Sequence, residues 1–174
     1  DLGVKIAKAT RQAMGADYPD EAVDRVLFWL ADQGRLGRKS KSGFYAYDEK
    51  GDRLGLWDGL EQKYPADKMQ PSLADVQHRL LFAQVLEAVR ALEEGVLTDI
   101  REGDVGAILG WGFAPWSGGP FSWLDIIGAA RAVEICRGLT AQFGPRFHAP
   151  ALLREMAEKG ETFYARFAGE KAAA

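Results

Sequence analysis

Apolar residues recur three and four positions apart over most of this chain, and the segments that show this spacing end at glycine. Val4, Ala7 and Met14, for example, lead to Gly15. The spacing predicts amphipathic helices, because an α-helix completes one turn in 3.6 residues. Glycine suits the position after a helix, since it adopts the left-handed conformation without steric penalty. Helices are therefore predicted over residues 1–14, 19–33, 72–94, 102–109, 124–128, 130–143 and 150–159.

Strand signals are almost absent from the sequence. Only the short segment from Phe44 to Tyr47 alternates between faces as a half-buried strand would. Residues 48–70 are polar and interrupted by three glycines and Pro65, which indicates a connector. The predicted fold class is therefore all-α.

The helix expected from residue 72 has the clearest start signal, because Ser72 followed by Asp75 is a capping-box pattern. Glu87 is expected close to the apolar side of this helix, where burial would raise its pKa. A structural role with Arg79 or Arg90 as partner is favoured for Glu87 over a role as a tuned acid. The apolar side is expected to contain Val76, Leu80, Leu81, Val85, Val89 and Leu92.

A weak internal repeat divides the chain. The segment from Val4 to Gly34 resembles the segment from Val133 to Gly160, and both are expected to form helix, loop, helix and glycine. No counterpart of residues 72–128 precedes the first copy, so we expect a piece of a longer protein. The predicted organisation is the end of a first helical repeat at 1–52, a connector at 53–71, a complete second repeat at 72–170 and a tail at 171–174.

Composition limits the kinds of partner. The formal net charge is -3, which argues against nucleic acid or an anionic membrane as the main partner. No apolar stretch approaches the roughly 20 residues that span a bilayer, and no signal segment is recognisable. The single cysteine, Cys136, is expected to be a buried packing residue, and no metal site is predicted. The two histidines, His78 and His148, are interpreted as surface residues.

The segment from Gly34 to Tyr47 combines two arginines, two lysines and two serines with a Phe-Tyr-x-Tyr ending. Three interpretations are open: a loop that contacts phosphate, a tight structural turn fixed by its aromatic residues, or a solvated run of charge. Glycine-flanked loops bring backbone N–H groups and cations close to an anion. Burial of Phe44 or Tyr45 would instead stabilise the loop by roughly 2 to 3 kcal/mol per ring. The structural interpretation is favoured.

Several motifs in order resemble the carboxy-terminal region of 3-hydroxyacyl-CoA dehydrogenases, in the duplicated form found in multifunctional fatty-acid β-oxidation enzymes of the α-subunit type. The first unit contributes residues 1–8, DLGVKIAK, and the loop Gly37-Arg38-Lys39-Ser40 with Gly43-Phe44-Tyr45. The second unit contributes Arg79-Leu80-Leu81, Glu87-Ala88-Val89, Leu92-Glu93-Glu94-Gly95, Asp104, Gly110-x-Gly112-Phe113-x-Pro115, Gly118-Gly119 and Trp123-Leu124-Asp125-x-x-Gly128.

The resemblance implies a helical domain like the carboxy-terminal domain of 6-phosphogluconate dehydrogenase, with one partial and one complete repeat packed face to face. It also implies that NAD-dependent oxidation of 3-hydroxyacyl-CoA takes place on an amino-terminal Rossmann domain, with a His–Glu pair. This chain has no G-x-G-x-x-G after a strand, so we expect no catalytic and no cofactor-binding residue in it, and no activity from it alone.

The partners implied are the Rossmann domain, an enoyl-CoA hydratase domain, the acyl-CoA substrate and a thiolase subunit. The expected location is the cytoplasm of a bacterium, or an organelle matrix in a eukaryote. The role implied for this chain is support of cleft closure and of pseudo-dimer assembly. Two alternatives remain: a stand-alone interaction or dimerisation module, and a small CoA-binding domain.

Two groups of residues are candidates for contacts. Arg38, Lys39 and Lys41 are candidates for contact with CoA or with the adjoining dehydrogenase domain. The packing or interface candidates are Phe44, Tyr45, Trp111, Phe113, Trp116, Phe121 and Trp123. The last five could line an acyl tunnel or fill the seam between repeats, and packing is favoured.

Three further positions carry expectations. Lys41 replaces a common glycine of the family pattern, so a turn that needs positive φ is expected to be shifted or rebuilt there. Ala114 replaces a common proline and leaves Pro115 to hold the corner. Asp125 is interpreted as a cap or turn former and not as a base.

Overall fold

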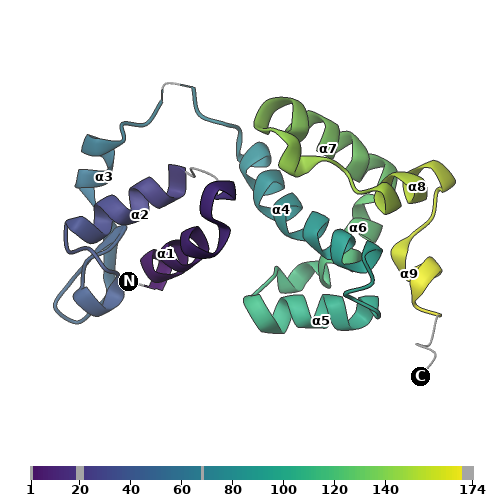
Figure 1. The fold of residues 1–174 in the computed structure, drawn as a ribbon, viewed down its shortest axis with the longest axis horizontal. Helices are drawn as coiled ribbons and strands as arrows, with labels where there is room; N and C mark the ends of the chain where they lie inside the picture. Colours follow the sequence, from purple (N-terminus) through teal and green to yellow (C-terminus); the bar gives the residue numbers. More distant parts are fainter. Residues whose placement is uncertain (1, 19–21, 68, 170–174) are drawn as a thin grey trace. The chain divides into compact units, whose positions relative to one another are not determined.

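The computed structural model of the chain describes residues 2–18, 22–67 and 69–169 (Figure 1). Two compact units are present, one formed by Asp1–Gln70 and the other by Pro71–Ala174. Among the described residues, no helix has both the length and the apolar character needed to cross a membrane.

The first unit contains three helices and a small hairpin. Its elements are α1 (Leu2–Met14), α2 (Ala22–Asp32), β1 (Tyr45–Tyr47), β2 (Arg53–Leu56) and α3 (Asp58–Lys63), with 3₁₀ turns at Gly15–Asp17 and Arg38–Ser40. The two strands pair antiparallel, with Tyr45 opposite Leu56. The expected start of α2 at Pro19 lies outside the described residues.

A buried carboxylate joins α1 to α2. Asp24 of α2 accepts a hydrogen bond from the hydroxyl of Tyr18 and forms an ion pair of 3.4 Å with Nε of Arg11. The Arg11 guanidinium also lies 5.0 Å from the ring centre of Phe28. The hydrogen bond to Asp24 is the main reason that the pKa of the Tyr18 hydroxyl is raised.

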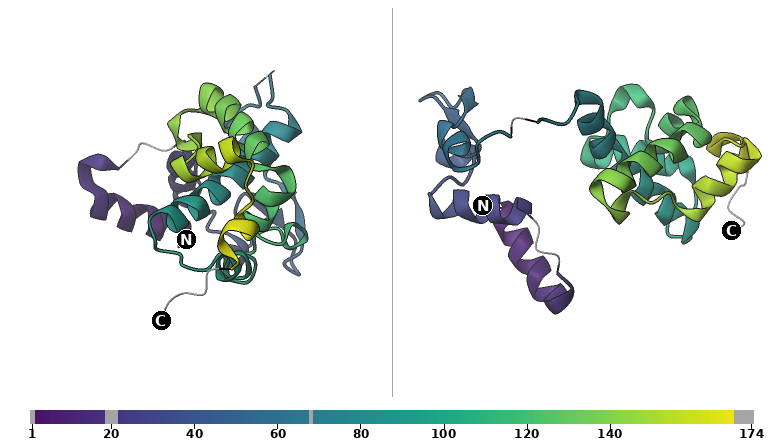
Figure 2. Two further views of the ribbon diagram at one scale, coloured as in Figure 1. Left: turned by 90° about the vertical axis from the view of Figure 1, so that its right-hand side faces the viewer. Right: turned by 90° about the horizontal axis from the view of Figure 1, so that it is seen from above.

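The second unit is entirely helical among its described residues. Its helices are α4 (Leu73–Glu93), α5 (Ile100–Trp111), α6 (Pro120–Ile127), α7 (Ala129–Phe143), α8 (Ala151–Lys159) and α9 (Phe163–Phe167), with 3₁₀ turns at Pro115–Ser117 and Pro145–Phe147. Both views in Figure 2 show α7 and α8 side by side, in keeping with their extensive contacts. The largest fully buried side chains include Phe82, Phe121, Leu124, Leu153, Met156 and Phe163.

The all-α prediction is confirmed, and the hairpin is the only departure in the described residues. The connector expected over 53–71 holds β2 and α3, which fold with the first unit, and the units divide after Gln70. The strand signal at Phe44–Tyr47 corresponds to β1, whereas β2 was missed because Gly55 interrupts the alternation that identifies strands. The assignment of the units to two repeats, and their packing together, stay predictions.

The two segments of the proposed repeat end in the same way. Gly34 and Gly160 both have positive φ, 72° and 66°. The residue after each glycine donates its N–H to a carbonyl five positions earlier, Arg35 to Leu30 at 2.9 Å and Glu161 to Met156 at 3.0 Å. This shared cap supports the repeat seen in the sequence.

Helix α4 begins as predicted, and Leu81, Val85, Val89 and Leu92 of the expected apolar side are buried or pack against the core. Ser72 accepts a hydrogen bond from the backbone N–H of Asp75 at 3.1 Å. Leu80 is 64% exposed, and the buried residues are Phe82, Val85, Leu86 and Val89. Val76 is also exposed, so the expectation that Val76 and Leu80 are buried was wrong.

Candidate functional site

The basic loop of the first unit is a closed hydrogen-bonded turn. Gly37 donates its N–H to the carbonyl of Ser42 at 2.7 Å, and Ser42 donates back to Gly37 at 3.3 Å. The Ser40 hydroxyl accepts from the N–H of Leu36 at 3.1 Å and lies 3.0 Å from the carbonyl of Gly37. The serine side chain therefore occupies the centre of the turn and satisfies backbone groups that a loop otherwise exposes.

Arg35 fixes this turn to the rest of the unit. Its Nε donates to the carbonyl of Gly43 at 2.8 Å and its Nη2 to the carbonyl of Tyr45 at 3.2 Å. Its guanidinium lies 4.0 Å from the ring centre of Trp57, which stacks on Trp29 of α2 at 5.5 Å. The sequence does not reveal this role of Arg35, because Trp57, on which its guanidinium lies, is 22 residues away in the chain.

Lys41 keeps the turn that the family pattern forms with glycine. Its φ is 50° and its ψ is 20°, and it is the only described residue other than glycine with positive φ. Its ammonium donates to the carbonyl of Glu49. The expectation of a shifted or rebuilt turn was therefore wrong: the lysine adopts the left-handed conformation directly, which costs about 1 to 2 kcal/mol for a residue with a Cβ.

Gly43 permits a close crossing of the loop strands. A Cβ at this position would lie 2.9 Å from the Cα of Gly37. Atoms that close would force the backbone apart, so the crossing requires glycine. This is a specific structural reason for one glycine of the motif.

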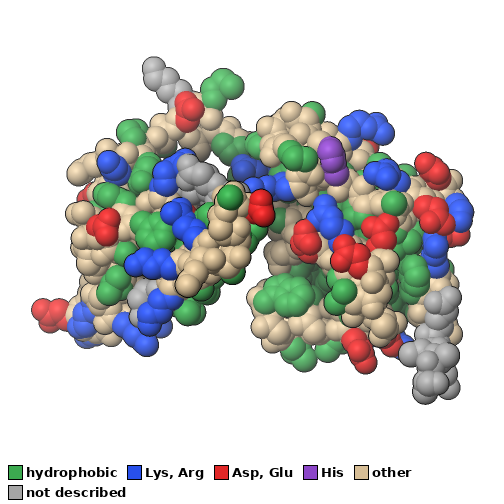
Figure 3. Space-filling model, in the orientation of Figure 1, with side chains coloured by type: hydrophobic (Ala, Val, Ile, Leu, Met, Phe, Trp, Pro, Cys, Tyr) green, Lys and Arg blue, Asp and Glu red, His purple; other side chains and the backbone are tan. Residues whose placement is uncertain are grey.

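Arg38 and Lys39 lie on a different side of the turn from Lys41. They line a pocket of about 470 Å³ together with Ser40, Leu36 and the start of α1. Both side chains are exposed, and neither makes an ion pair with any residue that the structure describes. Figure 3 shows Lys and Arg side chains gathered on the visible face of the first unit. The structure thus brings two of the three candidate cations together and leaves the third apart.

The aromatic residues of the loop are only partly buried. Phe44 is 40% exposed, and Tyr45 is half-buried with the Arg53 guanidinium 4.1 Å from its ring centre. Neither ring fills a helical core as the structural interpretation supposed, because Arg35 and Trp57 hold the loop instead.

The aromatic segment of the second unit separates into two sets. Phe113, Phe121 and Trp123 belong to the buried core. Trp111 and Trp116 are 63% and 75% exposed. Packing is therefore the role of the first set, and the two exposed tryptophans remain candidates for an interface.

Asp104 organises the turn that carries these aromatic residues. Its buried carboxylate accepts hydrogen bonds from the N–H of Phe121 at 2.7 Å, from the N–H and hydroxyl of Ser122 at 3.0 and 2.6 Å, and from the hydroxyl of Tyr164 at 3.0 Å. A Cβ on Gly119 would lie 2.5 Å from the side chain of Asp104. The carboxylate thus caps α6 from another helix, a role that no local sequence signal reveals.

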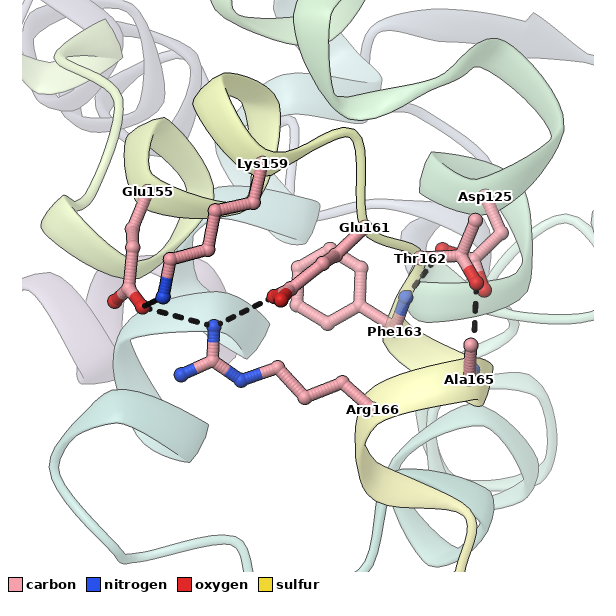
Figure 4. A network of polar contacts seen from close by, with 8 residues as sticks. All are labelled: Asp125, Glu155, Lys159, Glu161, Thr162, Phe163, Ala165 and Arg166. Atoms are coloured by element: carbon pink, nitrogen blue, oxygen red, sulfur yellow. Dashed lines mark hydrogen bonds and ion pairs between the residues drawn. The ribbon is translucent and has the colours of Figure 1, made fainter.

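Asp125 likewise caps a helix, as its sequence context predicted. Its two oxygens accept the N–H groups of Phe163 at 2.7 Å and Tyr164 at 2.9 Å, at the start of α9. Figure 4 shows the hydrogen bond between Asp125 and Phe163, beside an ion-pair chain in which Arg166 bridges Glu155 and Glu161 at 3.2 and 3.0 Å. The hydrogen bond from Lys159 is the main reason that the pKa of Glu155 is lowered.

The other candidate residues, Glu87, His78, His148 and Cys136, do not form a shared site. Glu87 is paired with Arg90, and its side chain is 70% exposed, so its expected position near the apolar side was wrong. The ring of His78 lies edge-on to Phe82, and His148 is exposed. Cys136 is buried, as predicted. Across residues 2–18, 22–67 and 69–169, no three His, Cys, Asp or Glu residues form a group that could hold a metal ion.

The described residues of the second unit thus form an all-helical domain in which the buried Asp104 and the half-buried Asp125 cap helices. Residues 76–169 match the family described as the 3-hydroxyacyl-CoA dehydrogenase C-terminal domain. This match covers more than half of the chain, and the chain belongs to that family.

A curated relative extends the similarity to the first unit. The fatty acid oxidation complex subunit alpha of Shewanella amazonensis is 37% identical over 168 residues, which are 94% of this chain and 23% of the relative. The chain therefore spans about a quarter of the length of that relative.

Proposed function

We propose that this chain is a carboxy-terminal helical part of a 3-hydroxyacyl-CoA dehydrogenase within a multifunctional fatty-acid oxidation enzyme of a bacterial cytoplasm. The family match over residues 76–169 is the observation that carries the proposal. Its role is to support oxidation of 3-hydroxyacyl-CoA to 3-ketoacyl-CoA by closing the cleft and assembling the pseudo-dimer. The Rossmann and hydratase domains, and a thiolase subunit, are its proposed partners.

The polar side chains of this chain suit a structural role and not acid–base catalysis. The carboxylates of Asp104 and Asp125 are used as helix caps. Neither His78 nor His148 has a carboxylate partner among the described residues, so the chain offers no His–Glu pair for proton transfer. The acid and base of the proposed reaction therefore belong to another part of the enzyme.

The described residues also do not fit NAD. A dinucleotide site of the Rossmann type needs a glycine-rich turn between a parallel strand and a helix. The glycine-rich turn at Gly34–Gly43 follows a helix and leads into an antiparallel hairpin. We therefore assign NAD to the proposed Rossmann partner.

Domain replacement tests the proposal. In the Shewanella subunit, the matching 168 residues would be replaced by this chain, and NADH formation from 3-hydroxybutyryl-CoA would be followed at 340 nm, the absorbance of NADH. We expect the hybrid to retain activity and a deletion of the same residues to abolish it. A hybrid as inactive as the deletion, or NADH formation by this chain alone, would contradict the proposal.

A second candidate function, CoA binding, is favoured by the pocket beside Arg38 and Lys39. Unpaired cations beside a glycine-rich turn suit the phosphates of CoA. Isothermal titration of the chain with CoA tests this function, with Lys39→Ala as the variant and Lys50→Ala as the matched control in the same unit. Binding tighter than about 100 μM that is lost only in Lys39→Ala supports CoA binding.

A stand-alone interaction module is the third candidate, favoured by the exposure of Trp111 and Trp116. Exposed tryptophans are typical anchors of interfaces. Sedimentation of the chain distinguishes this function: a dimer that dissociates in Trp116→Ala supports the module, whereas a monomer at all concentrations supports the domain of a larger enzyme.

A further inference from the structure

A pocket of about 490 Å³ lies between α7 and the start of α8. One wall is a single face of α7, because Val133, Cys136, Arg137, Thr140 and Ala141 are three, one, three and one positions apart. The opposite wall is formed by residues 148–149 and 154. All of these residues belong to the second unit, and none takes part in the contacts described above for the basic loop or the helix caps.

The rim of this pocket is basic. Arg137 and Arg154 are exposed and line it together with His148, and none of its described lining residues is acidic. Arg137 makes no ion pair or hydrogen bond within the described parts of the chain. The described lining of this pocket therefore carries only positive side-chain charge at neutral pH, from Arg137 and Arg154.

The acids closest in sequence to these arginines are already paired. Glu134, three residues before Arg137, binds Arg131 at 2.6 Å. Glu155, the neighbour of Arg154, binds Lys159 at 2.6 Å and Arg166 at 3.2 Å. Among the described residues, neither Arg137 nor Arg154 forms an ion pair.

The basic rim is held in position by the backbone. Arg154 donates from Nη1 to the carbonyl of Ala149 at 3.0 Å, which keeps its guanidinium against the pocket wall. Arg90 of α4 donates from Nη2 to the carbonyls of Arg146 and His148 at 3.3 and 3.2 Å. These bonds fix the segment that carries His148, so the wall is preorganised.

The floor of the pocket is apolar apart from one hydroxyl. Val133, Ala141 and the buried Cys136 supply the apolar part, and burial raises the pKa of the Cys136 thiol to about 11, so the thiol is neutral. Thr140 also lines the pocket, and its buried Oγ1 has no hydrogen-bond partner among the described residues. The apolar floor suits a ligand that carries a short apolar part.

We propose that this pocket binds a small molecule that carries a phosphate or carboxylate group attached to a short apolar chain. The oxyanion lies between the guanidinium groups of Arg137 and Arg154, which bind such groups with paired N–H donors. The apolar chain covers Val133 and Ala141. This inference does not depend on the dehydrogenase assignment.

Nuclear magnetic resonance of the 174-residue chain at low salt tests the site. Inorganic phosphate and hexanoate are titrated separately, and the backbone amide shifts of Arg137, Thr140 and Ala149 are followed. We expect saturating shifts with a dissociation constant on the order of 1 mM for at least one probe. Saturation with phosphate alone identifies a phosphorylated ligand, and saturation with hexanoate alone identifies a carboxylate. An absence of saturation with both probes would overturn the proposal.

Three variants separate a built site from general attraction of anions. Arg137→Gln and Arg154→Gln should each weaken binding about tenfold, since each removes charge-assisted hydrogen bonds. Arg79→Gln in α4 changes the net charge of the second unit equally, but Arg79 lies outside the pocket and has no ion pair among the described residues, so binding should be unchanged. Equal weakening by Arg79→Gln and Arg137→Gln would refute a specific site. All three positions are exposed, and the amide spectrum itself reports whether each variant is folded.

Discussion

The carboxylate of Asp104 in α5 accepts a hydrogen bond of 3.0 Å from the hydroxyl of Tyr164 in α9, which lies 60 residues further along the chain. The same carboxylate caps the start of α6 through the N–H groups of Phe121 and Ser122. One buried side chain therefore connects three helices of the second unit.

Removal of this carboxylate should destabilise the second unit strongly. Asp104→Ala leaves the N–H groups of Phe121 and Ser122 without their acceptor, and we expect the free energy of unfolding to fall by about 3 kcal/mol. Tyr164→Phe removes only one donor and should lower it by about 1 kcal/mol. Urea unfolding followed by circular dichroism measures both variants. Equal losses in the two variants would show that the cap of α6 contributes little.

Glycine substitutions should have opposite effects at two positions of the second unit. Gly119→Ala places a Cβ 2.5 Å from Asp104 at a φ of 114°, so we expect a loss of about 2 kcal/mol or more. Gly138→Ala lies in α7 with open space around it and should stabilise the unit by about 0.5 to 1 kcal/mol. Thermal unfolding compares the two, and a gain of stability in Gly119→Ala would contradict the close approach.

Lys41→Gly should stabilise the first unit. Glycine relieves the left-handed strain, although it increases the entropy of the unfolded chain, and the net gain should be about 0.5 to 1 kcal/mol. Lys39→Gly is the matched control, since Lys39 has negative φ in the same turn, and it should not stabilise. The midpoints of urea unfolding give the comparison. A loss of stability in Lys41→Gly would mean that the contact of Lys41 with Glu49 outweighs the strain.

The cap of α5 should make stability depend on pH in acid. The side chain and the backbone N–H of Arg101 hold the pKa of Asp99 at about 2, below its ordinary value of 3.8. Because the folded pKa is the lower one, the contribution of Asp99 is present above pH 3.8 and is lost as the pH falls toward about 2. Asp99→Asn keeps a capping oxygen without a titrating group. Over this pH range the wild-type chain should lose more stability than Asp99→Asn, and parallel curves would exclude the effect.

The thiol of Cys136 should be unreactive in the folded chain. Burial raises its pKa to about 11, and the thiolate is the form that reacts. At neutral pH, Ellman's reagent should label the chain only after unfolding by denaturant. Labelling within minutes in native buffer would indicate that α7 opens away from the core.

Local signals predicted the longer helices but not the short helices α3 and α9, which are capped by Tyr64 and Ala168 and not by a glycine. The Ser72 cap, and the glycines that end helices such as α1 and α8, were recognisable because their partners lie within a few residues. The acceptor role of Asp104 was not, because its partners lie 17 to 60 residues away. In α4, Leu80 and Glu87 are seven residues apart and share one exposed face, which the aliphatic pattern alone did not distinguish from the buried face.

The basic loop illustrates the same division. Its glycines and serines indicated a tight turn, and the structure contains one. Arg35 builds the turn because its guanidinium lies on the ring of Trp57, which stacks on Trp29. Only the folded chain brings Trp57 to Arg35, whereas Arg38 remains available for a ligand. The sequence thus identified the loop that holds the candidate contact residues, but it did not show which of its cations are free to contact a ligand.

The attachment of α9 through Asp125 limits how far the chain can be shortened. Phe163 packs against Phe121 with ring centres 5.2 Å apart, and its N–H is held by Asp125. A chain ending at Gly160 would lose that ring and leave both Asp125 and Asp104 with fewer donors. Helix α9 is therefore part of the core of the second unit. A truncated chain that lacks α9 would lose binding because it misfolds, and that loss would not show that α9 itself binds a partner.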